Sequence, residues 1–337
     1  MKSVIKKLSE ATGPSGYETQ VRNLVREEIK AFVDEITVDN LGNLIARKGQ
    51  RTARGQKIMI AAHMDEIGLI VSHIDEKGFA RFTPVGGLRR LSALAGRVQF
   101  LNGAMGVIGA ERLADPGKTP PFDQMYIDFG ASSRVDCPVQ IGDLAVFERS
   151  FVDLGQRLVG KALDDRVGVA LLIEVLRQMS ERGVESPHEL YFVFSAQEEV
   201  GARGAAVAAY KIDPDLGLAV DLTPSAGTPK SLRMAVELGK GPAITVRDQH
   251  MLSDPHVVDW MVRTAEQAGV PHQIEILESG SSEGRAIQLT RSGVRVGGLS
   301  VPARYLHSPS EMVEYADIQH SLRLLLELLS NPVVIAP

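Results

Sequence analysis

Five apolar segments of the chain lead directly into histidine or carboxylate side chains. These segments are "IMIAAHMD" with His63 and Asp65, "RLVGKALDDR" with Asp164 and Asp165, "LYFVFSAQEEVG" with Glu198 and Glu199, "LGLAVD" with Asp221, and "VRVGGLSVPARYLHSPSEM" with His307. Any one of these endings is typical of a turn or of the start of a helix. Because five predicted strands end in this way, the pattern indicates a single site.

The residue types at these endings favour a metal centre. Two histidines and four or five carboxylates, with no cysteine among them, form a mixed nitrogen and oxygen donor set that suits Zn²⁺ or Co²⁺, and also Mn²⁺. One carboxylate shared by two ions, each with one histidine and one further carboxylate, uses five donors. The remaining acid could act as a general base in metal-assisted hydrolysis. Glu198 and Glu199 could divide these two roles, and Asp65 could orient the ring of His63.

The other reactive residue types have less specific surroundings. His73, His188, His272 and His320 are interpreted as solvent-facing or structural, whereas His250 and His256 could line a pocket. Glu66 is given a structural role by default. Cys137 precedes a proline and has no histidine or lysine beside it, so we expect a buried structural thiol.

The elements that must position these residues alternate between strand and helix. "ELYFVFS" and "LGLAV" are almost wholly apolar, as expected for strands covered on both faces. Helical periodicity follows in 164–183, in 255–268 between Asp254 and Gly269, and in 314–330. Near the N-terminus, Ser15 and Glu18 form a capping-box pattern before a helix, and a hairpin is expected around 40–42. We therefore predict an α/β fold with a mixed, largely parallel sheet and flanking helices, whose carboxyl edge carries the site.

The pattern of apolar and turn-forming residues changes between about 73 and 156. Short apolar runs alternate there with turns that contain Gly, Asn and Asp, and Asn102-Gly103 is a strong hairpin signal. The helical pattern is weak and is confined to 87–95. We expect a small β domain at 73–156, inserted into a catalytic domain made of 1–72 and 157–337.

The composition is that of an ordinary globular protein. The chain has 337 residues, 44% hydrophobic and 23% charged, and a formal net charge of −5. No cluster of Lys and Arg predicts binding to nucleic acid or to an anionic membrane, and no segment is long enough to span a bilayer. One cysteine and the lack of a secretory signal pattern favour a reducing, cytoplasmic location.

The motifs "AAHMDEIG", "GKALDDRVG", "SAQEEVGARGA", "AVDLTP" and "RYLHSPSEM" resemble, in this order, those of one known family. This is the family of dinuclear metallo-aminopeptidases of the tetrahedral (TET) type, which includes glutamyl and deblocking aminopeptidases. The resemblance extends from 61 to 312. It implies an enzyme that removes N-terminal residues from peptides, with two divalent metal ions per subunit and a dinuclear zinc exopeptidase fold.

The resemblance also implies roles for individual residues. Asp164 would bridge the two ions, His63 and Asp221 would complete one site, and Glu199 and His307 would complete the other. Glu198 would be the general base, and Asp65 would orient His63. The inserted domain would be PDZ-like and would mediate assembly into homo-oligomers, from dimers to tetrahedral dodecamers.

One segment departs from the family pattern. Where members commonly carry a stretch like Gly-Gly-Thr-Asp-Ala, this chain has "ESGSSEGRAIQ" (278–288), in which Glu283 stands near the usual Asp and Arg285 has no counterpart. Two alternatives stay open, and this segment is the reason for the first of them. The same centre could hydrolyse another amide, as an N-acyl amino acid deacylase or a carboxypeptidase, or the chain could be a non-catalytic assembly protein.

Overall fold

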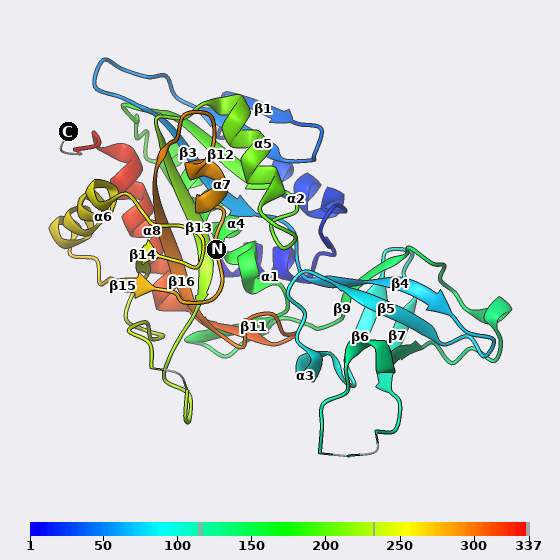
Figure 1. Cartoon of the computed structure of the whole chain (residues 1–337). Coiled ribbons are helices and arrows are strands. Elements are labelled where there is room, and N and C mark those ends of the chain that lie inside the picture. The colour runs from blue at the N-terminus through cyan, green and yellow to red at the C-terminus, as the bar shows by residue number, and fades with distance from the viewer. Residues whose placement is uncertain (114, 116, 232, 335–337) are drawn as a thin grey trace.

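The computed structural model describes residues 1–113, 115, 117–231 and 233–334. Its strands form two bodies, an eleven-stranded sheet covered by helices and a closed barrel that lies to one side of it (Figure 1). The α/β architecture with a mixed sheet and flanking helices is confirmed. The expectation of a largely parallel sheet is wrong, because most neighbouring strands of the large sheet pair antiparallel.

Four parallel strands form the centre of the large sheet, in the order β12, β3, β13 and β16. Their bounds are Glu189–Ser195, Lys57–His63, Leu216–Pro224 and Arg295–Arg304. Because they are parallel, their carboxyl ends meet at one edge of the sheet, where the apolar runs change to polar residues.

Antiparallel strands extend the sheet on both sides. On the β12 side lie β2 (Leu44–Lys48) and β1 (Glu35–Val38), which form the hairpin expected around 40–42. The opposite side carries β17 (Glu311–Glu314), β11 (Arg157–Gly160) and β10 (Val152–Asp153). A branch, β14 (Ala243–Arg247) and β15 (Gln273–Ile276), pairs with β16. The sheet is therefore mixed: the four central strands are parallel, β14 and β15 are parallel to each other, and the other pairings are antiparallel.

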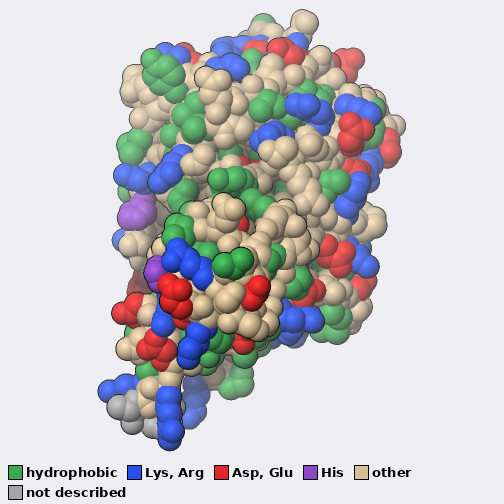
Figure 2. All heavy atoms as spheres, turned by 90° about the vertical axis from the view of Figure 1, so that its right-hand side faces the viewer, with side chains coloured by type: hydrophobic (Ala, Val, Ile, Leu, Met, Phe, Trp, Pro, Cys, Tyr) green, Lys and Arg blue, Asp and Glu red, His purple; other side chains and the backbone are tan. Residues whose placement is uncertain are grey.

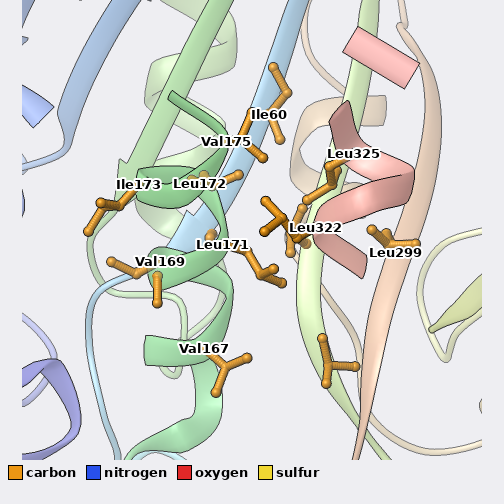
Figure 3. Close-up of a cluster of buried hydrophobic side chains, with 14 of the residues drawn as sticks. Ile60, Val167, Val169, Leu171, Leu172, Ile173, Val175, Leu299, Leu322 and Leu325 are labelled. Atoms are coloured by element: carbon orange, nitrogen blue, oxygen red, sulfur yellow. The ribbon is translucent and has the colours of Figure 1, made fainter. Parts of the chain in front are cut away.

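Helices cover both faces of the sheet. One face carries α1 (Lys2–Glu10), α2 (Thr19–Ile29), α4 (Leu163–Glu181), α6 (Pro255–Ala268) and α8 (Tyr315–Ser330). The other carries α5 (Arg203–Ile212) and α7 (Gly284–Gln288). Figure 3 shows the larger core, where Leu171 and Leu172 of α4 pack among Ile60 of β3 and Leu325 of α8. Burial on both sides explains why the central strands are apolar almost throughout.

The barrel has its own apolar core, which includes Val71, Phe82, Val98 and Ile127. Its strands are β4 (Gly68–Ile74), β5 (Ala80–Val85), β6 (Arg97–Phe100), β7 (Met105–Ala110), β8 (Met125–Asp128) and β9 (Leu144–Phe147). The turn at Asn102-Gly103 joins β6 to β7 as predicted. The only α-helix between β5 and β6, α3 (Arg90–Ala93), is short, in agreement with the weak helical pattern at 87–95.

One prediction about a helix start is wrong. α2 begins at Thr19, its N-cap is Glu18, and no side chain caps it, so Ser15 is not part of a capping box. Ser15 instead donates a 2.6 Å hydrogen bond to Asp65, and Glu18 accepts from the main chain of Gly16 and Gln197. By contrast, Asp254 caps α6 through its side chain and Gly269 ends it, as predicted.

Among the described residues, side chains of both charges are mixed on the side of the molecule where the barrel lies. Figure 2 shows Lys and Arg side chains interspersed with Asp and Glu side chains across that view. In the part of the chain that the structure describes, no helix combines the length and the apolar composition needed to cross a membrane.

Candidate metal centre

The carboxyl edge of the sheet brings together residues from five parts of the chain. His63 is the last residue of β3, Asp221 lies in β13, and Asp164 lies in the first turn of α4. Glu198 and Glu199 follow β12, and His307 follows β16. All six line one cavity of about 410 Å³. The structure therefore places six of the seven predicted site residues around a common space, whereas Asp65 is not among the described residues that line it.

The first set of donor atoms comes from His63, Asp164 and Asp221, and all three lie within 4.8 Å of one another. Nε2 of His63 is 3.2 Å from Oδ1 of Asp164 and 4.0 Å from Oδ1 of Asp221. All three side chains are buried. One imidazole and two carboxylates at these separations could hold a divalent ion.

The second set comes from Asp164, Glu199 and His307 and meets the same distance limit. Nε2 of His307 is 3.5 Å from Oδ2 of Asp164 and 3.6 Å from Oε1 of Glu199. Asp164 therefore faces the two histidines with different oxygens, Oδ1 toward His63 and Oδ2 toward His307. Its geometry is that of a carboxylate that could serve two ions at once.

Asp65 ties two of these segments together. Its Oδ1 accepts from the main-chain N–H of Glu198 at 2.9 Å, and its Oδ2 accepts from that of Glu199 at 3.1 Å. Nδ1 of His63 lies 3.5 Å from Oδ1 of Asp65 and 3.1 Å from its carbonyl oxygen. Burial opposes ionisation of Asp65, but the contacts with His63 and Ser15 outweigh it and lower the pKa of this carboxyl. Asp65 thus fixes both the His63 ring and the loop that carries the two glutamates.

Two positioning contacts were not predicted from the sequence. Glu311 of β17 accepts from the main-chain N–H of Asp164 at 3.0 Å and from that of His307 at 2.9 Å, so it holds both segments. Nδ1 of His307 donates to the carbonyl of Gly87, which belongs to the link between β5 and α3, at 3.1 Å. Glu311 lies in the motif "RYLHSPSEM", but an acid that binds two main-chain groups has no signature of its own in a sequence.

The electrostatics of the cluster fit a cation. Burial, with repulsion from nearby Asp164, raises the pKa of Glu199 to about 7, although His307 opposes the shift. Burial and repulsion from other acids also raise the pKa values of Asp221 and Glu198. A positive charge among these groups would favour their ionised forms. The donor chemistry and the crowding of buried acids thus both fit divalent metal ions.

The cavity also contains residues that the sequence analysis did not single out. They include Arg89, which is exposed, and the acids Asp248 and Glu275, which are both buried. Glu275 accepts hydrogen bonds from Thr223, Thr245 and Ser300. Part of the unusual 278–288 segment, Ser279–Ser282, lines the cavity as well. These acids went unnoticed because each stands alone in the sequence.

The remaining residues named in the sequence analysis do not contribute donor atoms to either set. His250 and His256 are not among the described residues that line the cavity. Glu283 is buried, and neither of its carboxylate oxygens has a hydrogen-bond partner among the described residues. Glu66 has the structural role expected of it, because Lys161 lies 2.8 Å and Arg166 3.4 Å from its carboxylate. Cys137 packs against the barrel core, but it is half-buried and not buried as expected.

Two known proteins are similar to this chain in sequence. A relative from Acetivibrio thermocellus is 44% identical over 329 residues, which cover 97% of this chain and 98% of that protein. The lysyl aminopeptidase of Pyrococcus furiosus is 34% identical, with coverage of 97% and 96%. Both matches extend over nearly the whole of each protein.

Solved structures give a corresponding match in three dimensions. The TET aminopeptidase of a marine sediment Thaumarchaeota archaeon superposes with a TM-score of 0.93 at 31% identity, covering 98% of this chain and 96% of that one. The Pyrococcus horikoshii TET1 peptidase, described as assembling into a tetrahedron or a large octahedral shell, has a TM-score of 0.88 at 32% identity, with coverage of 97% and 98%. The family model for the M42 glutamyl aminopeptidases matches residues 42–324. The chain therefore belongs to the M42 family of aminopeptidases and is an enzyme that hydrolyses peptide bonds.

Proposed function

We propose that this aminopeptidase works through a dinuclear metal centre built on Asp164. His63 and Asp221 would complete one site, and Glu199 and His307 the other, with Zn²⁺ or Co²⁺ as the expected ions and Mn²⁺ as a further candidate. The observation that carries the proposal is the sharing of Asp164 between the two donor sets, one oxygen to each. The metal requirement of the family agrees with it.

Such a centre, when loaded, supplies activation of water and polarisation of the scissile carbonyl. The protein's own contribution begins with Glu198, which lines the cavity but belongs to neither donor set. Its carboxylate would accept a proton from the attacking water and deliver it to the nitrogen of the leaving amine. Asp65 accepts from the main chain of Glu198 and also contacts His63. It would therefore fix the position of the base relative to the donor His63. No covalent intermediate is required.

The test of this mechanism combines metal content with activity. Chelation of the purified protein should abolish hydrolysis of aminoacyl anilides, and return of Zn²⁺ or Co²⁺ should restore it with about two ions bound per chain. A panel of N-acylated amino acids should stay unhydrolysed. Turnover of the blocked compounds alone would favour a deacylase, whereas a protein that neither binds metal nor hydrolyses either class would be a non-catalytic assembly protein.

We also propose that the barrel is a PDZ-like insertion that mediates assembly into a homo-oligomer. Its strands lie between Gly68 and Phe147, close to the 73–156 range expected from the sequence. Several of its apolar side chains are exposed, including Val107, Ile141 and Val135, the last of them 94% exposed. Light scattering of the wild-type protein should give the mass of several chains, and V135D should reduce it. A monomeric wild-type protein would contradict the proposal.

A further inference from the structure

A short strap from the barrel, residues 86–89, lies against the candidate metal centre. The carbonyl of Gly87 accepts from Nδ1 of His307. A Cβ atom on Gly87 would lie 2.4 Å from that nitrogen, and one on Gly86 would lie 3.0 Å from Oε2 of Glu199, so only glycine fits this approach. Leu88 is anchored in the barrel core. The strap therefore contacts the metal centre through Gly86 and Gly87 and the barrel core through Leu88. These contacts fix the main chain from which the Arg89 side chain extends.

Arg89 lies where two cavities adjoin. It lines the cavity of the metal centre and also a second cavity of about 450 Å³, and Leu306 lines both as well. The second cavity is bounded largely by apolar side chains, which include Val159, Tyr305 and Met312. A chain that leaves the metal centre past Arg89 would enter an apolar space.

Arg89 places a positive charge where the two cavities adjoin. Among the described residues that line the metal-centre cavity, Arg89 alone is a lysine or arginine, whereas six are Asp or Glu. Its side chain is exposed, and no hydrogen bond or ion pair engages it within the described part of the chain. A guanidinium without a partner inside the protein is available to a carboxylate of a ligand, which it can bind through two parallel hydrogen bonds.

The direction of a bound peptide follows from the reaction. An aminopeptidase holds the N-terminal residue of its substrate at the metal centre, so the rest of the peptide continues on the other side of the scissile bond. We propose that Arg89 binds the C-terminal carboxylate of short peptides and that the second cavity accepts apolar side chains that follow the scissile bond. The proposal rests on the dinuclear centre being the site of hydrolysis, and it adds a preference for short peptides with a free carboxyl end.

Kinetics on matched substrates test the carboxylate contact. The substrates are peptides of two, three and four residues, each as the free acid and as the C-terminal amide, together with an aminoacyl anilide. For at least one length, the wild-type enzyme should have a kcat/KM for the free acid that exceeds that for the amide by roughly threefold to tenfold. In R89Q a higher KM for the free acid should bring this ratio close to one. R89K should keep part of the preference for the free acid. R90Q is the matched control, because Arg90 is exposed and lines neither cavity.

The apolar cavity has its own readout. The wild-type kcat/KM should be higher for peptides with Leu after the scissile bond than for those with Ala. M312A should reduce this difference in kcat/KM. The proposal is contradicted if free acids and amides are equivalent in the wild type, or if R89Q lowers kcat/KM for both to the same extent. Hydrolysis of the anilide by the wild type separates these outcomes from a failure of the dinuclear site, which would abolish turnover of every substrate.

Discussion

Nε2 of His63 lies 3.2 Å from Oδ1 of Asp164, and this contact joins residues 101 positions apart in the chain. The other oxygen of Asp164 faces His307. Asp164 is thus the one residue common to both donor sets. Its replacement should therefore affect the centre differently from the replacement of any other donor.

The two aspartates of the first donor set provide a direct comparison. D164N should lose both ions, because it removes an anionic donor from each set, whereas D221N should keep the set formed by Asp164, Glu199 and His307. Both variants should lose more than about 100-fold in activity. Elemental analysis after dialysis measures the difference, and equal metal content in the two variants would argue against a shared carboxylate.

The close approach of Gly87 to His307 predicts a steric effect. In G87A the new methyl group would meet the imidazole, so His307 or the strap must shift. Displacement of a reacting geometry by about 1 Å can cost about 100-fold in rate. We expect a loss of that order in kcat with little change in the urea midpoint of unfolding. Wild-type activity in G87A would show that the strap does not constrain His307.

The buried ion pair around Glu66 should support stability. The side chains of Glu66, Lys161 and Arg166 are at most 5% exposed, and Arg166 also donates to the carbonyls of Leu8 and Met64. E66Q leaves two buried cations without an anion, so the free energy of unfolding should fall by about 3 kcal/mol or more. Urea unfolding measures this loss. E27Q, which removes an exposed ion pair with Lys30, is the control and should unfold like the wild type.

His188 should make stability depend on pH. Its Nδ1 accepts from the main chain of Gln56 at 3.0 Å, and its Nε2 donates to the carbonyl of Asn331 at 2.9 Å. Protonation would place two N–H groups face to face. Burial lowers the pKa of His188, although the contact with Asn331 opposes this effect.

The unfolded chain therefore binds a proton at His188 that the folded chain resists. The stabilisation is complete above the unfolded pKa of about 6.5 and is lost as the pH falls below it. Between about pH 7.5 and about pH 5.5, the free energy of unfolding should fall less in H188N than in the wild type. H73N is the control, since His73 is exposed. An equal loss in H188N and the wild type would exclude this role for His188.

The sequence predicted the fold class and the clustering of the site residues because parallel strands impose a common edge. The apolar runs that end on His63 and Asp221 belong to neighbouring strands, so their position follows from topology alone. Ser15 shows the limit of local patterns. Its spacing to Glu18 matched a capping box, but a tertiary hydrogen bond to Asp65 determines its environment.

The residues that the sequence did not reveal act across long separations. Gly87 reaches His307 over 220 positions, and Glu311 reaches Asp164 over 147. Neither contact alters the local periodicity on which the sequence predictions depend. Among the predicted residue roles, that of Glu198 as the proton acceptor has the most direct test.

That test is the comparison of E198Q with the wild type in metal content and in kcat. Glu198 belongs to neither donor set, so E198Q should bind as much metal as the wild type. It should nevertheless lose about 100-fold to 10,000-fold in kcat, because the proton acceptor is gone. Unchanged activity in E198Q, or a wild-type protein that stays fully active after its metal is removed, would contradict the account.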